Sequence, residues 1–263
     1  MLSTPDPWNA VAEGYDQITR PAFETFTREA LALAAPGKQA RLLDVATGPG
    51  TLPLLAAEDV ASIVAIDFSE EMLRLCRRNV AHLPNVDVRH GDGQALSFDQ
   101  AFDAAFSLFG LIFFDDRAAG FAGLHRALVP GGTAVVSAWP PPARSTAMSH
   151  GIALMHAALP DTAKQPPPTD GLNSADALVR EMEAAGFVDV HVQESRFAFT
   201  ATADAFWRGL ADAFAPITFA RRTMPAEVWQ AAEDRGRAWL EKHHDADAEL
   251  EYVALLGRGT RPA

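Results

Sequence analysis

The sequence predicts an α/β protein with a doubly wound, largely parallel sheet. Apolar runs of strand length alternate with helical stretches between residues 41 and 139, which is typical of βαβ units. The first run ends in a glycine turn, Thr47-Gly48-Pro49-Gly50, as is common where a strand of such a sheet enters a helix. The 263 residues suffice for one domain of this kind with insertions.

The elements of the first half follow from apolar spacing. A helical period predicts a helix over residues 22–34, closed by Pro36-Gly37. Ser69 is expected to cap the helix after the second strand, because acids follow it in the first turn, where the helix dipole favours them. A further helix, with Phe121, Leu124 and Leu128 on one face, is expected to end at Pro130-Gly131-Gly132. The expected strands are 41–46, 61–66, 86–89, 102–108 and 133–139.

The pattern changes after residue 139. Residues 140–172 contain proline runs at 140–142 and 166–168, and we expect a loop around a short helix there. Ser174 is expected to cap a helix that Gly186 ends. The remaining expected elements are a strand through Val188, Val190 and Val192, two amphipathic helices within 203–243, and a final strand over 251–256. The chain shows no internal repeat, so we expect a single domain, 1–263.

Composition narrows the possible partners. The net charge is −12 and only three lysines are present, which argues against nucleic acid, because binding it relies on cations that neutralise phosphates. No run of eighteen apolar residues predicts a membrane span, and the first residues lack the pattern of a secretory signal. The single cysteine, Cys76, has no partner for an internal disulfide. We therefore expect a cytoplasmic protein without nucleic-acid or membrane partners, and its oligomeric state stays open.

The glycine turn and a later acid together indicate a nucleotide site. Ligands of open parallel sheets bind at the carboxyl ends of the strands. Gly48 and Gly50 lack a Cβ, so the backbone can turn sharply and approach a ligand there. Asp67, which ends the second expected strand, lies 17 residues beyond Gly50 and is placed to accept both hydroxyls of a ribose.

Two residues favour S-adenosylmethionine over a dinucleotide. The dinucleotide fingerprint has a third glycine three residues after the second, and here that position is Pro53. Asp44 precedes the glycines, and its charge would repel a pyrophosphate but suit a cationic ligand. The methionine end of S-adenosylmethionine carries an ammonium and a sulfonium, so the pattern points to this cofactor.

These segments resemble the class I S-adenosylmethionine-dependent methyltransferases, particularly small-molecule enzymes similar to the ubiquinone/menaquinone C-methyltransferases. The resemblance is clear over about residues 8–139 and looser over 174–200 and 249–258. Ala46 stands where many members have glycine. The matching segments are Tyr15-Asp16, 42–50, 67–73, 90–93, 106–110 and 128–132.

The resemblance implies a seven-stranded, Rossmann-like sheet whose last strand is antiparallel, with a helical N-terminal cap and a helical insertion before that strand. It divides the chain into a helical cap (1–38), a cofactor-binding half (39–139), acceptor-side insertions with strand six (140–248) and the last strand (249–263). Asp92 would accept from the adenine amine, and Gly93 would offer its amide to the ring. The cofactor site would comprise Tyr15, Asp44, Thr47, Gly48, Gly50, Asp67, Phe68, Met72, Asp92, Gly93 and Phe109, and S-adenosylhomocysteine would be the product.

We therefore hypothesise methyl transfer from S-adenosylmethionine to O, N or C of a small, aromatic or partly apolar acceptor. Residues 140–172 and the aromatic-rich 203–243 would form the acceptor pocket and a lid. The catalytic residue is unknown, and no spacing predicts a metal site. The alternatives are an NAD-dependent oxidoreductase and a non-catalytic S-adenosylmethionine-binding protein. The histidines weighed as a general base are His150, His156, His243 and His244.

Overall fold

The structure is a computed structural model that describes residues 2–161 and 171–263. The second proline run, 166–168, and part of the expected lid therefore lie outside the described residues. In the described ranges, no helix is both long and apolar enough to cross a membrane.

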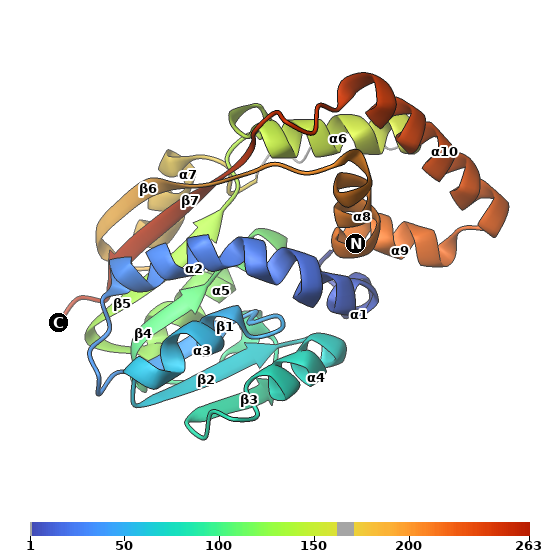
Figure 1. The fold of residues 1–263 in the computed structure, drawn as a ribbon. Coiled ribbons are helices and arrows are strands. Elements are labelled where there is room, and N and C mark those ends of the chain that lie inside the picture. Colours follow the sequence, from blue (N-terminus) through green and yellow to red (C-terminus); the bar gives the residue numbers. More distant parts are fainter. Residues whose placement is uncertain (1, 162–170) are drawn as a thin grey trace.

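A seven-stranded sheet forms the centre of the molecule, in the order β3-β2-β1-β4-β5-β7-β6 (Figure 1). All neighbouring strands are parallel except β7, which runs antiparallel to both β5 and β6. The predicted mostly parallel sheet with an antiparallel last strand is confirmed. Because the strand order reverses between β1 and β4, a ligand site is expected at their carboxyl ends. The strands are β1 (Arg41–Val45), β2 (Ser62–Asp67), β3 (Val86–His90), β4 (Phe102–Ser107), β5 (Leu128–Ala138), β6 (Val188–Phe199) and β7 (Leu250–Thr260).

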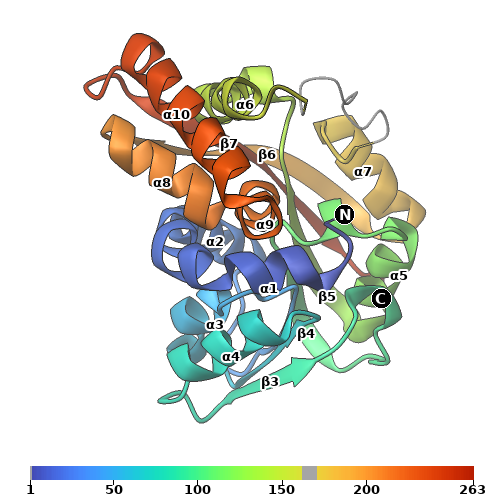
Figure 2. The same cartoon turned by 90° about the vertical axis from the view of Figure 1, so that its right-hand side faces the viewer.

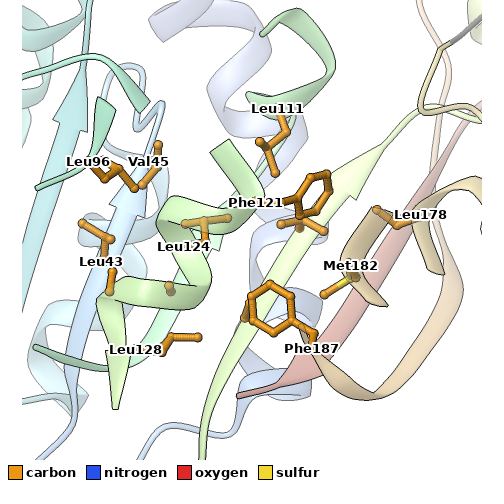
Figure 3. Packing of buried hydrophobic residues seen from close by; sticks show 14 of the residues in the cluster. Leu43, Val45, Leu96, Leu111, Phe121, Leu124, Leu128, Leu178, Met182 and Phe187 are labelled. Atoms are coloured by element: carbon orange, nitrogen blue, oxygen red, sulfur yellow. The ribbon is translucent and has the colours of Figure 1, made fainter. Parts of the chain in front are cut away.

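Helices cover both faces of this sheet. On one face, α2 (Arg20–Ala34), α3 (Thr51–Ala56) and α4 (Glu70–Asn79) bury apolar side chains against the strands. On the other, α5 (Arg117–Ala127) and α7 (Ala175–Ala184) pack against the largest buried cluster. Figure 3 shows that cluster, in which side chains of α5 and α7 face those of the strands. Burial of this kind is the main stabilising contribution to the fold and fixes the strand ends that carry the site.

The predicted helix caps on these faces are confirmed. Ser69 Oγ accepts a hydrogen bond from the Met72 amide at 3.2 Å, at the start of α4. Ser174 caps α7 in the same way, and Gly186 follows α7 with a φ of 97°, a left-handed conformation that suits glycine. The start of α4 is thereby fixed directly after Asp67, the residue expected to bind a ribose.

One predicted boundary is wrong. The helix expected to include Leu128 ends at Ala127, and Leu128 already pairs with Phe102 as the first residue of β5. Proline disfavours the helical conformation in the residue before it, so the chain is already extended ahead of Pro130. The register between β4 and β5 then shifts between Phe102 and Ala104 before regular pairing resumes. β5 is consequently longer than predicted.

A second layer of helices lies above the carboxyl ends of the strands (Figures 1 and 2). The N-terminal segment contributes α1 (Pro5–Gly14) and a π-helix (Tyr15–Thr19) that leads into α2. Residues 203–243 form three helices rather than the predicted two, because Pro216 fits the first turn of a new helix but cannot continue the preceding one. The other helices of the layer are α6 (Thr146–Ala158), α8 (Ala203–Ala213), α9 (Ala215–Thr223) and α10 (Ala226–His243), which share a separate buried cluster.

Candidate functional site

A cavity of about 450 Å³ lies between the sheet and the upper helices. Its floor is formed by the segments that follow β1, β2, β3 and β4, and one wall by the N-terminal helices. Side chains of α6, α8, β6 and β7 form the opposite side. The volume is within the range of small-molecule sites. Eight of the predicted cofactor residues line it, namely Tyr15, Gly48, Asp67, Phe68, Met72, Asp92, Gly93 and Phe109.

The glycine turn after β1 contributes its backbone to the floor. Ala46 and Gly48 line the cavity with φ angles of 60° and 56°, so both are left-handed. Such a conformation is unusual for alanine and often marks functional loops. Gly50, with a φ of 91°, does not line the cavity, and a Cβ there would lie 2.8 Å from Cys76 Sγ. Gly50 therefore allows α3 and α4 to pack closely, whereas Gly48 faces the cavity.

Asp67 is fixed at the end of β2 by backbone donors. Its side chain accepts from the Gly48 amide at 2.8 Å and from the Ser69 amide at 2.9 Å. The residue is 5% exposed and lines the cavity. Burial raises the pKa of Asp67 to about 6, and the hydrogen bonds from the backbone oppose that rise. A carboxylate has about four lone-pair positions, so two remain for hydroxyl donors.

Asp44 and Thr47 lie beneath the cavity rather than on its surface. Thr47 Oγ1 donates to Asp44 Oδ2 at 2.6 Å, and Asp44 is 3% exposed. Burial raises the pKa of Asp44 to about 7; the Thr47 hydrogen bond opposes this rise, and the nearby Asp67 charge adds to it. The arrangement supports the turn from below, and direct contact of Asp44 or Thr47 with a cofactor stays a prediction.

The segment after β3 packs closely against neighbouring side chains. Asp92 and Gly93 line the cavity, and the Asp92 carboxylate also accepts from the Gln94 amide at 2.9 Å. A Cβ at Gly93 would lie 2.4 Å from Phe114 Cζ and 2.7 Å from Val45 Cγ1. Glycine is therefore required sterically between these two side chains. The Gly93 backbone and the neighbouring Asp92 are thus both held at the cavity surface.

The N-terminal helices close the cavity above this floor. Asn9 Oδ1 on α1 accepts from Ser69 Oγ at 2.7 Å, which ties α1 to the start of α4. Tyr15 begins the π-helix and lines the cavity. Withdrawal from water and the Asp67 charge raise the pKa of the Tyr15 phenol. Met72 and Phe68 also line the cavity from α4 and the turn before it. π-Helical turns often occur at functional sites.

An aromatic wall links this region to the upper helices. Phe109 has a left-handed φ of 60°, and its amide donates to Ser137 Oγ at 2.7 Å. Its ring stacks on Trp139 with centroids 4.2 Å apart, and Phe23 and Tyr252 continue the wall. Sequence reasoning identified Phe109 but missed Trp139, Phe23 and Tyr252. Trp139 could have been found, because it directly follows the carboxyl end of β5.

The histidines weighed as bases lie away from the cavity. His150 Nε2 is 3.1 Å from His244 Nδ1, and His244 Nε2 is 2.8 Å from the Ala201 carbonyl. This contact joins α6 to the end of α10, and no histidine within the described part of the chain lines the cavity. Residues 2–161 and 171–263 also contain no group of three or more histidine, cysteine or acidic residues able to hold a metal.

The aromatic residues of 203–243 divide between cavity and core. Phe206 and Phe214 line the cavity, and Phe206 also belongs to the buried cluster that joins α6, α8 and α10. Trp207, Trp229 and Trp239 pack in that cluster and do not line the cavity. The acceptor pocket expected from this segment is thus built by only part of its aromatic content.

Comparison with known proteins agrees with this geometry. Residues 42–132 match the family model described as a methyltransferase domain. Demethylmenaquinone methyltransferase of Thermus thermophilus is 38% identical over 144 residues, or 51% of this chain and 65% of that protein. The enzyme of the same name from Clavibacter sepedonicus is 40% identical over 47% of this chain and 48% of its own length. The chain thus spans about half to two thirds of the length of these curated relatives.

Solved structures share the fold over most of the chain. Phosphoethanolamine N-methyltransferase 2 of Haemonchus contortus, solved with S-adenosylhomocysteine, gives a TM-score of 0.53 at 17% identity, covering 90% of this chain and 53% of that one. The cyclase SpnF gives a TM-score of 0.59 at 20% identity, covering 91% and 81%. At these identities the likeness concerns the fold alone. Residues 42–132 thus match a methyltransferase domain, and the solved structures share the fold that surrounds it.

Proposed function

We propose that the protein transfers the methyl group of S-adenosylmethionine to O, N or C of a small, aromatic or partly apolar acceptor. The observation that carries this proposal is one cavity with two unlike ends. Its carboxylates, Asp67 and Asp92, lie at the ends of β2 and β3, whereas aromatic and aliphatic side chains line its other end. The demethylmenaquinone methyltransferase relatives support an acceptor of this type.

The polar end suits the cofactor in three respects. Asp67 has lone pairs left for the two ribose hydroxyls, since its backbone donors occupy only part of its capacity. Gly93 and Asp92 line the cavity next to each other, so an adenine would lie against the Gly93 backbone with its amine near the Asp92 carboxylate. Tyr15 would cover the methionine end. Asp44, Thr47 and Gly50 would support the turn rather than touch the cofactor.

The chain's own residues contribute mainly position and the exclusion of water. When bound, S-adenosylmethionine supplies an electrophilic methyl group on a sulfonium, so alignment of the acceptor can provide much of the rate. The Phe109–Trp139 stack gives a flat acceptor a surface to lie against. The upper helices and α1 enclose that surface. No histidine of the described chain reaches the cavity, so histidine is not proposed as a base.

The proposed division of the chain follows from this arrangement. Residues 1–38 act as a helical cap, 39–139 hold the cofactor, 140–248 supply the acceptor side, and 249–263 complete the sheet. Tyr252 on the last strand lines the cavity, which supports a contribution of this strand to the acceptor side as well. A reducing compartment such as the cytoplasm suits the free, buried Cys76.

The NAD-dependent alternative fits the structure less well. Pro53 is buried in α3 where a dinucleotide site needs a glycine, and a pyrophosphate would lie over the buried carboxylate of Asp44. The non-catalytic alternative shares the cofactor site and differs only in transfer. The cyclase SpnF illustrates that this fold also occurs in a protein named for another activity.

Calorimetry tests the cofactor assignment. The protein should bind S-adenosylmethionine and S-adenosylhomocysteine, and NAD should give no heat. Tighter binding of NAD than of both would overturn the proposal. Transfer itself is tested by release of S-adenosylhomocysteine with a panel of phenols, naphthols, aromatic amines and quinols. Binding of the cofactor without transfer to any member would favour the non-catalytic alternative.

A further inference from the structure

None of the described residues at the acceptor end of the cavity carries an ionised side chain. Within residues 2–161 and 171–263, the ionisable residues that line the cavity are Tyr15, Asp67, Asp92 and Tyr252. Both carboxylates belong to the cofactor end, because they lie at the carboxyl ends of β2 and β3. No lysine, arginine or histidine of the same ranges lines the cavity. A charged acceptor would find no counter-ion among the described residues at this end, and burying an unpaired charge is strongly unfavourable.

Tyr252 brings a hydroxyl to this end from the sheet, whereas the Thr19 hydroxyl, which also lines the cavity, donates to the Ala213 carbonyl at 3.5 Å. Among the described lining residues from position 139 onward, only Trp139 and Tyr252 carry an N–H or O–H in the side chain. Tyr252 lies on β7 opposite Phe197 of β6. Its ring stacks on Phe199 with centroids 5.5 Å apart and lies 6.0 Å from the ring of Trp139. These two ring contacts restrict the orientation of the Tyr252 ring and therefore the position of its hydroxyl.

The hydroxyl of Tyr252 is available as a hydrogen-bond donor. It has no hydrogen-bond partner among the described residues, and burial raises the pKa of Tyr252, so the phenol keeps its proton at neutral pH. The chain has two tyrosines, and both line this cavity. Tyr15 differs in position, because its phenol lies close enough to Asp67 to feel that charge. Tyr15 therefore belongs to the cofactor end and Tyr252 to the acceptor end.

We propose that the acceptor binds as an uncharged aromatic ring and that the Tyr252 hydroxyl selects for an oxygen on that ring. This inference rests on the proposed function and adds the charge state of the acceptor and the residue that recognises it. The aromatic wall supplies affinity for any flat apolar ring. Tyr252 then discriminates between rings, because a donor left without a partner in the complex lowers affinity for a ring that has no oxygen.

Three probes of one shape separate these contributions. Equilibrium dialysis of the S-adenosylhomocysteine complex at pH 7.5 measures the binding of 1-naphthol, naphthalene and the anion 1-naphthoate. We expect 1-naphthol to bind most tightly and 1-naphthoate most weakly. Tyr252→Phe should lower the affinity for 1-naphthol roughly 2- to 12-fold, which is the net contribution of one neutral hydrogen bond. The affinity for naphthalene should change by no more than about twofold. Tyr15→Phe makes the same chemical change at the other end and should leave the preference for 1-naphthol intact.

Each contrary result is distinct. Binding of 1-naphthoate as tight as that of 1-naphthol would overturn the neutral-acceptor inference. Equal losses of affinity for 1-naphthol and naphthalene in Tyr252→Phe would mean that the residue acts through packing alone. An unchanged affinity for both probes would mean that Tyr252 has no role in binding the acceptor. A complex that binds S-adenosylhomocysteine but none of the rings would refute this inference while leaving the cofactor assignment standing. Failure to bind S-adenosylhomocysteine would instead overturn the proposed function.

Discussion

Replacing Asp67 by asparagine tests the cofactor end in two independent ways. The change keeps the shape of the side chain but removes its charge and one acceptor oxygen. Burial raises the pKa of Asp67 from 3.8 to about 6 in the folded protein. The folded state therefore binds more protons than the unfolded state between these two values, and the wild type loses stability as the pH rises through them. The asparagine of Asp67→Asn does not titrate, so the variant does not lose this stability.

The magnitude follows from the two pKa values. The two pKa values differ by about 2.2, and each pKa unit corresponds to about 1.36 kcal/mol. The free energy of unfolding of the variant should therefore rise by about 3 kcal/mol relative to the wild type between low and high pH. About 2 kcal/mol of this develops between pH 4.5 and pH 8, because the unfolded carboxyl is already mostly ionised at pH 4.5. The NH2 group of the asparagine side chain would face one of the two backbone N–H donors, Gly48 or Ser69, and two donors cannot form a hydrogen bond with each other. That cost is the same at every pH and cancels in the comparison.

Urea unfolding of both proteins across this pH range gives the difference directly. Asp103→Asn is a matched control, because the Arg41 guanidinium holds the pKa of Asp103 below its usual value. The Asp103 carboxyl is therefore largely ionised in both the folded and the unfolded state above about pH 4.5, so the stability of this variant relative to the wild type should stay nearly constant across the range. A stability difference for Asp67→Asn that does not change with pH would refute the reasoning about its burial.

Asp67→Asn should also weaken the binding of the cofactor. A carboxylate that accepts two ribose hydroxyls makes charge-assisted bonds of about 1.5–3 kcal/mol each, against about 0.5–1.5 kcal/mol for a neutral acceptor. We expect a loss of about 2 kcal/mol, or roughly 30-fold in the affinity for S-adenosylhomocysteine, by calorimetry. Asp103→Asn should leave the affinity unchanged. An unchanged affinity in Asp67→Asn would mean that the ribose lies elsewhere.

Two further predictions concern Gly93 and the contact between α6 and the end of α10. Gly93→Ala should lower the affinity for S-adenosylhomocysteine at least about tenfold, because its methyl would overlap Phe114, whereas Gly37→Ala, with nothing within 4 Å, should change little. Similar affinities for S-adenosylhomocysteine in the two variants would contradict the placement of the adenine at Gly93. Burial and the neighbouring His244 and His243 lower the pKa of His150 below 6.5. As the pH falls, the unfolded state therefore binds this proton before the folded state does. Thermal unfolding should show that the protein loses stability as the pH falls below about 6.5. His150→Phe should reduce that loss, and parallel curves for the two proteins would argue against it.

The sheet and its floor could be predicted from sequence because local signals and tertiary structure agree there. Ser69, followed by acids, marks the start of α4, and the carboxylate before it lies where a parallel strand ends. Gly93 is glycine for a tertiary reason, since only contact with Phe114 and Val45 requires it, yet its place after a strand still indicated the site. Gly50 shows the limit of such reasoning, because its requirement arises from Cys76 and not from a ligand.

The acceptor end could not be predicted because no local pattern specifies it. Trp139 directly follows β5, whereas Phe23 and Tyr252 come from α2 and β7, and only the folded chain brings their rings together. Aromatic residues of helical segments give the same sequence pattern whether they face a cavity or a core, as Phe206 and Trp207 show side by side on α8. The third helix within 203–243 was missed, although Pro216 was a visible signal for its start.

The two ends of the cavity are built by different means, and this difference bears on how such a protein changes its acceptor. At the cofactor end, backbone amides of Gly48 and Ser69 hold Asp67, so the geometry depends on the strand ends and tolerates little change. At the acceptor end, the described side chains of α6, α8, β6 and β7 that line the cavity carry no charge. Substitutions in the helices alter shape and hydrogen bonding while the sheet is unaffected, so one cofactor site can serve different acceptors. Tyr252 differs from the helical positions, because it lies on a strand of the sheet itself. A change of its hydroxyl should therefore alter acceptor preference with less effect on packing than any change in the helices above.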